Sequence, residues 1–245
     1  MAAEGQIVLS GGASGIGRAI VERLVREGRR VCVLDRDEAG LAALAEAMGA
    51  AIATAAVDIS DFEAVGAAVS EFVGQGPIRG LVNNAGWDES TRFIDTDPAF
   101  WRKVIDINLY GPLNLTHAVL PHLVNAGGGR VVSIASDAGR VGSSGEAVYS
   151  AAKGGTIALM KTLAREHARD GITFNSVCPG PTDTPLLEAV DPTGKLQSAL
   201  ERAVPMRRLA TPEDFPGLVS FLLSEEAGYI TGQTISVSGG LSMHG

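Results

Sequence analysis

Short apolar runs rich in β-branched residues alternate along the chain with longer segments of helical periodicity. Seven runs predict β-strands, at residues 7–9, 31–34, 52–57, 78–82, 131–134, 172–177 and 235–237. Segments with helical spacing predict helices at 15–27, 39–48, from 60 onwards, 99–124 and 147–169. Apolar strands that alternate with helices are typical of a parallel sheet covered on both faces. The pattern therefore predicts an α/β fold with a single doubly wound sheet of about seven strands.

Turn and capping residues support these boundaries. Gly28 and Gly49 stand where helix C-termini favour glycine, and Ser60-x-x-Glu63 predicts a capping box at the start of the third helix. Residues 181–205 have a weak pattern and are rich in Pro, Thr and charges. Because no linker composition divides the chain, we expect one domain over 1–245, with a variable substrate loop or lid at about 185–205.

The charge balance and the cysteines narrow the cellular setting. Lys and Arg number 20 against 28 Asp and Glu, a formal net charge of −8, whereas nucleic-acid-binding proteins usually carry an excess of basic residues. Cys32 and Cys178 each lie in an apolar run, which indicates buried free thiols. The chain shows no signal-peptide pattern and no apolar run near the ~20 residues that span a bilayer. We expect a cytoplasmic protein without nucleic-acid or membrane partners.

Spacing excludes two other chemistries. The four histidines, at 117, 122, 167 and 244, are not arranged with acids or cysteines as zinc ligands are, so we expect no metal. The serines near glycines do not form G-x-S-x-G, so the sequence lacks the nucleophile elbow of α/β-hydrolases.

A glycine cluster follows the first predicted strand and opens the first helix. In Gly11-x-x-x-Gly15-Ile16-Gly17, glycines would let the backbone approach a pyrophosphate at the positive end of a helix. Asp35 ends the second strand, 18 residues after Gly17, where a carboxylate would bind the ribose hydroxyls of the adenosine. The cluster predicts a dinucleotide site. Asp35 favours NAD over NADP, although the adjacent Arg36 could accommodate a 2′-phosphate.

A tyrosine and a lysine form the second constellation. Tyr149 and Lys153 are four residues apart in a predicted helix, so the phenol and the ammonium share a face. A free tyrosine has a pKa of about 10, and a neighbouring cation would favour the phenolate and lower that pKa. Ser136 lies at a strand end, 13 residues before Tyr149. Together the three residues indicate acid–base chemistry on a hydroxyl or carbonyl group.

These features resemble the short-chain dehydrogenase/reductase family over essentially the whole chain. Ser10 stands where the family usually has Thr, and the hydroxyl is kept. The matching stretches, in order, are SGGASGIG (10–17), Asp35, Asp58, NNAG (83–86), Asn108, Ser136, YSAAK (149–153) and PGPTDT (179–184).

The resemblance implies a Rossmann-type fold, NAD as the cofactor and a homotetramer whose interfaces use the long helices. It also implies four catalytic residues, Asn108, Ser136, Tyr149 and Lys153. The residues implied in cofactor binding are Gly11, Ser14, Gly15, Ile16, Gly17, Asp35, Asp58, Ile59, Asn84, Ala85, Gly86, Tyr149, Lys153, Pro179, Gly180, Thr182 and Thr184.

Four further stretches, 83–88, 134–149, 163–175 and 230–245, resemble family members that oxidise a ring-bearing hydroxyacyl-CoA such as 2-hydroxycyclohexanecarbonyl-CoA. We therefore expect hydride transfer between NAD and an alicyclic or bulky secondary alcohol, as a CoA ester. The substrate pocket is assigned to Trp87, Val141 and Glu146, where Glu146 either makes a polar contact or caps the following helix. Basic residues for a CoA tail would be Arg140, Arg207 and Arg208.

Other functions remain open at this stage. A dehydrogenase of free aryl or cyclic secondary alcohols would need the same catalytic residues. A nucleotide-bound regulatory protein could keep the fold and lose the chemistry, but it would not need all four catalytic side chains. An epimerase that retains NAD is a third alternative.

Overall fold

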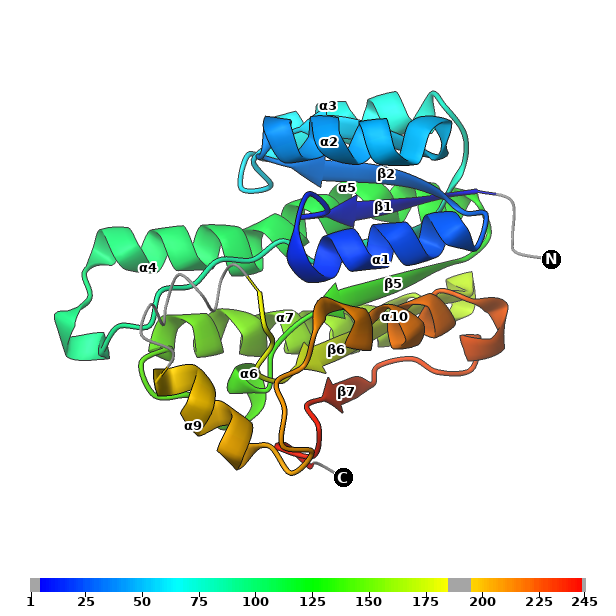
Figure 1. Cartoon of the computed structure of the whole chain (residues 1–245). Helices are drawn as coiled ribbons and strands as arrows, with labels where there is room; N and C mark the ends of the chain where they lie inside the picture. Colours follow the sequence, from blue (N-terminus) through cyan, green and yellow to red (C-terminus); the bar gives the residue numbers. More distant parts are fainter. Residues whose placement is uncertain (1–4, 185–194, 244–245) are drawn as a thin grey trace.

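The computed structural model describes residues 5–184 and 195–243, which are built around one sheet of seven parallel strands (Figure 1). Each apolar run that predicts a strand forms one. Neighbouring strands follow the order β3-β2-β1-β4-β5-β6-β7. This arrangement confirms the predicted α/β class. The strands are β1 Gln6–Ser10, β2 Arg30–Asp35, β3 Ile52–Ala56, β4 Ile78–Asn83, β5 Gly129–Ile134, β6 Ile172–Pro179 and β7 Thr234–Val237.

Helices cover both faces of the sheet. One face packs against α1 Gly15–Arg26, α2 Glu38–Met48 and α10 Pro216–Leu222. The other packs against α3 Phe62–Val73, α5 Gly111–Asn125 and α7 Ala147–Glu166. The shorter helices α4 Pro98–Ile105, α6 Ala138–Val141 and α9 Lys195–Ala203 lie beside the carboxyl edge of the sheet, and α4 extends beyond it (Figure 1). No helix in the described part of the chain is long and apolar enough to cross a membrane.

The middle positions of the central strands β1 and β2 are apolar because both faces of the sheet are buried there. In β1, Ile7 and Leu9 belong to the core under α1, and Val8 belongs to the core under α3 and α5. In β2, Val33 belongs to the core under α1, and Cys32 belongs to the core under α3 and α5. Successive side chains of a strand point to opposite faces, so a strand between two helix layers needs an unbroken apolar run.

The strand order reverses beside β1, whose neighbours are β2 and β4. Connections on either side of this point leave toward opposite faces of the sheet, so a crevice opens at the carboxyl ends of the strands. Ser10, Asp35 and Asn83 end the three strands that meet there. The topology thus brings the predicted functional residues to one edge.

The sequence expectation for the start of α3 is wrong. The N-cap of α3 is Asp61, whose carboxylate accepts from the backbone N–H of Ala64 at 3.0 Å, and Ser60 instead donates to Asp58 at 2.7 Å. The long helical stretch expected at 99–124 is confirmed as α4 and α5, which a π-helical turn at Asp106–Tyr110 joins. The lid expected at 185–205 includes α9, while its first part, 185–194, lies outside the described residues.

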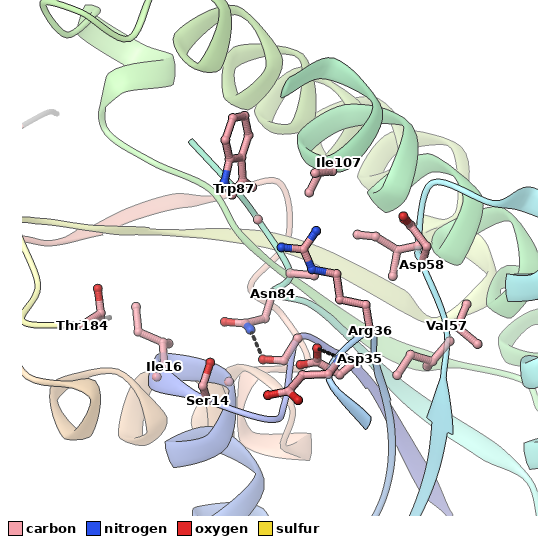
Figure 2. A pocket seen from close by; sticks show the side chains of 18 residues that line it. Ser14, Ile16, Asp35, Arg36, Val57, Asp58, Asn84, Trp87, Ile107 and Thr184 are labelled. Atoms are coloured by element: carbon pink, nitrogen blue, oxygen red, sulfur yellow. Dashed lines mark hydrogen bonds between the residues drawn. The ribbon is translucent and has the colours of Figure 1, made fainter. Parts of the chain in front are cut away.

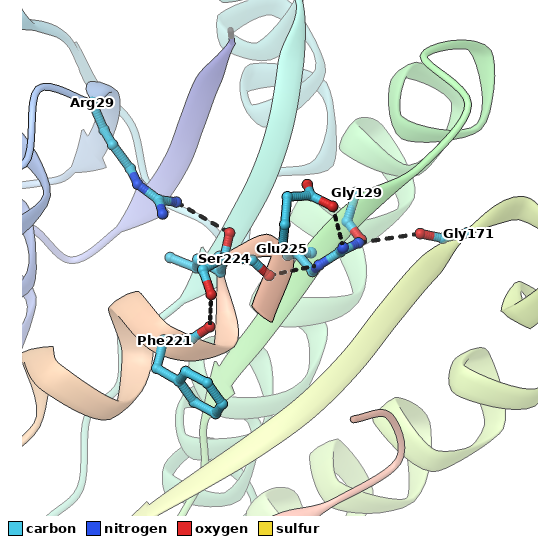
Figure 3. A network of polar contacts seen from close by, with 8 residues as sticks. Arg29, Gly129, Gly171, Phe221, Ser224 and Glu225 are labelled. Atoms are coloured by element: carbon cyan, nitrogen blue, oxygen red, sulfur yellow. Dashed lines mark hydrogen bonds and ion pairs between the residues drawn. The ribbon is translucent and has the colours of Figure 1, made fainter. Parts of the chain in front are cut away.

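A polar network ties together the amino edge of the sheet (Figure 3). The Arg130 side chain, in a residue only 9% exposed, donates to the carbonyl oxygens of Ser224, Gly129 and Gly171 and pairs with Glu225 at 3.0 Å. Arg29 donates to the carbonyl of Leu223, at the end of α10. These arginines satisfy backbone carbonyls that the ends of helices and strands leave without partners.

We expect Arg130→Met to lower the free energy of unfolding by about 2–3 kcal/mol, because it leaves several carbonyls without a donor. Glu225→Gln should change it by less than about 0.5 kcal/mol, because the Glu225 side chain is 69% exposed. Urea titrations of the three proteins measure both effects. Equal stability of Arg130→Met and the wild type would mean that water replaces the arginine at no cost.

Candidate active site

The loop between β1 and α1 contains glycines whose backbone conformation or close packing favours glycine. Gly11 and Gly15 have φ of +73° and +53°, which favour glycine. A Cβ on Gly17 would lie 1.9 Å from the carbonyl oxygen of Gly11. The Asn84 side-chain amide donates to that oxygen at 2.8 Å, so the end of β4 holds the loop in place (Figure 2). The loop therefore presents its backbone and the N-terminus of α1 to the space above it.

That space is a cleft of about 390 Å³ (Figure 2). Most residues that the family resemblance implies in cofactor binding lie on its walls. It is lined by Gly11, Ser14, Gly15, Ile16, Gly17, Leu34, Asp35, Arg36, Asp37, Val57, Asp58, Ile59, Asn84, Ala85, Gly86, Trp87, Ile107 and Thr184.

The remaining implied cofactor residues lie beyond this lining. Pro179 ends β6, and Gly180 packs so closely that a Cβ on it would lie 2.7 Å from Ser238 Cα. Thr182 is buried, and its hydroxyl donates to the carbonyl of Gly180 at 2.8 Å. Of the expected PGPTDT contacts, the structure brings Thr184 to the cleft wall.

Asp35 lies at the end of β2 with its carboxylate anchored. Its Oδ2 accepts from the backbone N–H of Ala13 at 2.9 Å, and its Oδ1 accepts from that of Asp37 at 3.1 Å. Arg36 is exposed and also lines the cleft. Asp58, on the opposite wall, has its pKa lowered mainly by a hydrogen bond from the Ser60 hydroxyl. Acceptors at the ends of β2 and β3, with glycine backbone between them, fit a dinucleotide.

Ser136, Tyr149 and Lys153 come together beside the cleft. Ser136 follows the end of β5, and its Oγ accepts from the N–H of Ala138 at 3.1 Å. Tyr149 lies in the first turn of α7 and Lys153 one turn later, with its Nζ 5.5 Å from the tyrosine ring centroid. Lys153 is 3% exposed and donates to the carbonyl of Ile134 at 3.0 Å. A Cβ on Gly86 would lie 3.4 Å from the lysine Nζ, so the ammonium contacts a residue of the cleft wall.

The electrostatics around Tyr149 differ from the sequence expectation. Burial raises the pKa of its phenol, the negative charges of Glu146 and Asp88 raise it further, and only a hydrogen bond with Ser136 acts in the opposite direction. Burial also lowers the pKa of Lys153 to about 8. The expected lowering of the phenol pKa by Lys153 is therefore not present in the chain alone, and the phenol is held in its protonated form.

Asn108 lies in the π-helical turn and is fully buried. Its Nδ2 donates to the carbonyls of Trp87 at 2.6 Å and Val104 at 2.9 Å, and its Oδ1 accepts from the N–H of Trp87 at 3.3 Å. Both amide hydrogens are therefore used within the protein. The geometry gives Asn108 the role of fixing the backbone that follows β4.

The three residues assigned to the substrate pocket lie in different surroundings. Trp87 lines the cleft, packs edge-to-face on Phe100 and has the Lys103 ammonium 3.5 Å from its ring centroid. Val141 is 63% exposed at the end of α6. Glu146 occupies the N-cap position of α7 without a capping hydrogen bond, so the capping alternative is wrong.

Two of the arginines expected to serve a CoA tail are engaged within the chain. Arg140 donates to the Ser236 hydroxyl at 3.1 Å and lies 3.7 Å from Asp137. Arg208 forms a two-pronged pair with Asp214, at 2.6 and 2.7 Å. Each arginine therefore already has an acidic partner, which would compete with a phosphate for it.

Sequence reasoning did not single out Asp88. It lies with Glu146 and Tyr149 on the wall of a narrow pocket next to the cleft. Burial raises its pKa to about 6, with a further contribution from Glu146. Its place directly after NNAG and Trp87 is the only sequence signal that points to it.

The chain is similar in sequence to known proteins over most of its length. Residues 11–242 match a family model described as enoyl-(acyl carrier protein) reductase. Acetoacetyl-CoA reductase of Shinella zoogloeoides is 39% identical, over 95% of this chain and 96% of that protein. The 2,3-dihydroxy-2,3-dihydro-p-cumate dehydrogenase of Pseudomonas putida is 38% identical, over 98% and 95%.

Solved structures agree with the sequence matches. The 3-ketoacyl-(acyl-carrier-protein) reductase of Brucella melitensis, complexed with NADH, superposes with a TM-score of 0.93 at 29% identity, covering 98% of this chain and 99% of that one. A variant of actinorhodin polyketide ketoreductase with NADPH superposes with a TM-score of 0.94 at 33% identity, covering both chains completely. The family model and the relatives cover nearly the whole chain, so the chain belongs to the short-chain dehydrogenase/reductase family of oxidoreductases.

Proposed function

We propose that the chain, as one dinucleotide-binding and catalytic domain, transfers a hydride between NAD and a ring-bearing or bulky secondary alcohol or ketone, which is carried on an acyl-CoA ester. The observation that carries the proposal is the meeting of Ser136, Tyr149 and Lys153 beside the cleft at the carboxyl edge of the sheet. Relatives that are named for an acyl-CoA substrate and for a ring-bearing dihydrodiol support the substrate class.

Each catalytic residue has one task in this reaction. A bound nicotinamide supplies or accepts the hydride. In oxidation, the Tyr149 phenolate takes the proton of the substrate hydroxyl, and in reduction the phenol returns it. The Ser136 hydroxyl hydrogen-bonds the substrate oxygen as charge develops on it. Lys153 places a positive charge near the phenol, and Asn108 holds the wall against which the substrate lies.

Asp35 should decide the choice of cofactor. Its anchored carboxylate would repel a 2′-phosphate, so we expect wild-type kcat/KM to favour NAD over NADP. Asp35→Ala should narrow that preference by about tenfold, mainly through better use of NADP. Arg36→Ala is the matched variant, because it removes the neighbouring cation. Equal use of both cofactors by the wild type would show that Arg36 outweighs the carboxylate.

The substrate is tested by comparing kcat/KM for three compounds with the same ring. We expect kcat/KM for 2-hydroxycyclohexanecarbonyl-CoA to exceed the values for the free hydroxy acid and for cyclohexanol. Equal values for all three would contradict the thioester and leave the second candidate, a dehydrogenase of free cyclic or aryl alcohols. That candidate is favoured by the internal pairing of Arg140 and Arg208, which leaves fewer cations for a CoA tail.

We further propose a homotetramer in the cytoplasm. The exposed faces of α4, α5 and α7 are the expected interfaces, and the two buried free thiols, Cys32 and Cys178, suit a reducing compartment. Light scattering after size exclusion measures the assembly directly. A monomer of the 25.3 kDa chain would overturn the tetramer.

A further inference from the structure

Two loops that are far apart in sequence pack together beside Tyr149. The segment that follows β4 meets the turn that precedes α7, where the N–H of Thr91 donates to the carbonyl of Gly145 at 2.9 Å. Gly145 has φ of +82°, and a Cβ on it would lie 2.6 Å from the Ser90 hydroxyl. The close approach therefore requires glycine and fixes the position of each loop relative to the other.

Each loop contributes a carboxylate to the narrow pocket that these loops form. Asp88 comes from the first loop and Glu146 from the second, and Tyr149 lines the same pocket. Both acids are only partly exposed. The other lining residues are uncharged: Thr91, Phe93, Thr96, Phe100, Gly145, Ala147 and Val148.

The backbone before Asp88 is also held in place. The Asn108 side chain bonds both the N–H and the carbonyl of Trp87, so the residue that follows cannot swing away without breaking these bonds. The Asp88 carboxylate accepts a hydrogen bond from the backbone of Glu89, which orients it further. Two loops and one buried amide thus keep negative charge next to the reacting phenol.

We infer that Asp88 and Glu146 act as a charge filter, which disfavours substrates with a carboxylate near the reacting carbon and favours those in which the acid is esterified. This inference rests on the proposed dehydrogenase and names the property of its substrate that these two carboxylates select. Like charges held near each other in a partly buried site repel strongly enough to give a discrimination of about 10- to 100-fold. A thioester or an ester of the same acid carries no such charge.

The titration of Asp88 gives the filter a pH dependence. Its pKa is raised to about 6, mainly by burial and in smaller part by the charges of Glu146 and Glu89, whereas the hydrogen bond from the Glu89 backbone and the charge of Lys153 act in the opposite direction. Tyr149, on the same wall, stays protonated over this range because its own pKa is raised. Below about pH 6 Asp88 loses its charge, so the discrimination against a carboxylate should weaken there.

The test uses one acid in two forms, 2-hydroxycyclohexanecarboxylate and its methyl ester. Titration calorimetry with the NAD-loaded enzyme gives the Kd of each, and steady-state kinetics gives kcat/KM. At pH 8 the wild type should favour the ester by about 10- to 100-fold. Asp88→Asn should reduce this ratio at least about fivefold, with Glu146→Gln as an independent second variant. Glu89→Gln is the control, because Glu89 is exposed and does not line the pocket.

The outcomes separate the filter from the proposed function. A ratio that falls in Asp88→Asn or Glu146→Gln, stays constant in Glu89→Gln and shrinks in the wild type at pH 5.5 supports the filter. The same ratio in all four proteins, or binding of neither compound, overturns it. Selective binding of the ester without turnover would refute the proposed reaction while the filter stands. Turnover of the acid and the ester at equal efficiency would overturn the filter and leave the proposed hydride transfer standing.

Discussion

Tyr149→Phe should fold normally, bind NAD with the affinity of the wild type and lose turnover by roughly 10³- to 10⁴-fold. The phenylalanine ring fills the same space in the first turn of α7, so the packing is kept. Only the hydroxyl that exchanges a proton with the substrate is removed. Thermal unfolding and NAD titration check the first two expectations, and kcat measures the third.

The pH profile gives a second check on Tyr149. Because burial, Glu146 and Asp88 all raise the pKa of the phenol, the chain alone favours the protonated tyrosine. Oxidation needs the phenolate, so kcat/KM for the alcohol should rise with pH through the range above neutrality, whereas reduction needs the phenol. Turnover by Tyr149→Phe above about one-tenth of the wild-type value would remove this residue from the mechanism.

Lys153→Met should lower kcat by roughly 10²- to 10³-fold, because it removes the positive charge near the phenol. Methionine is unbranched and of similar length, so it can occupy the same buried channel toward Ile134. Turnover close to the wild-type value would show that the phenol needs no neighbouring cation.

The stability of the same variant should depend on pH in a defined way. Burial lowers the pKa of Lys153 from 10.5 to about 8, so the folded chain releases a proton that the unfolded chain keeps between those values. The penalty of the buried charge is present in full below about pH 8 and disappears as the pH approaches 10.5. The unfolding free energy of Lys153→Met relative to the wild type should therefore decrease over this window. A pH-independent difference would show that the lysine is not titrating in the fold.

The strands were the easiest part to predict from sequence, because burial on both faces leaves a continuous apolar run such as Val31–Leu34. Asp35 was expected at the cofactor site from its place at a strand end, whereas Asn84 was expected there only from the family resemblance. The N-cap of α3 was misplaced by one residue, because Ser60 and Asp61 are both good caps and only the contact of Ser60 with Asp58 decides between them.

Other features could not be predicted, because they depend on contacts between distant segments. The apolar spacing of 99–124 continues through the π-helical turn, so periodicity gave no sign of it. The helix α10 is only seven residues long, too short for a periodic signal. The raised pKa of Tyr149 arises mainly from burial and then from Glu146 and Asp88, and Asp88 lies 61 positions earlier and comes near the phenol through the packing of two loops.

Because of the π-helical turn, a change in the number of residues in this segment should disturb the site more than a substitution of one residue. A π turn contains one more residue than the α-helical turn it replaces. Deleting one residue from Asp106–Tyr110 would let α4 and α5 fuse into a regular helix, rotated by about 100° on its α4 side. The rotation would carry Phe100 away from Trp87 and withdraw Asn108 from the backbone it holds. Evolutionary change in this stretch should therefore proceed by substitution, while single-residue insertions and deletions should be confined to the surface loops on either side.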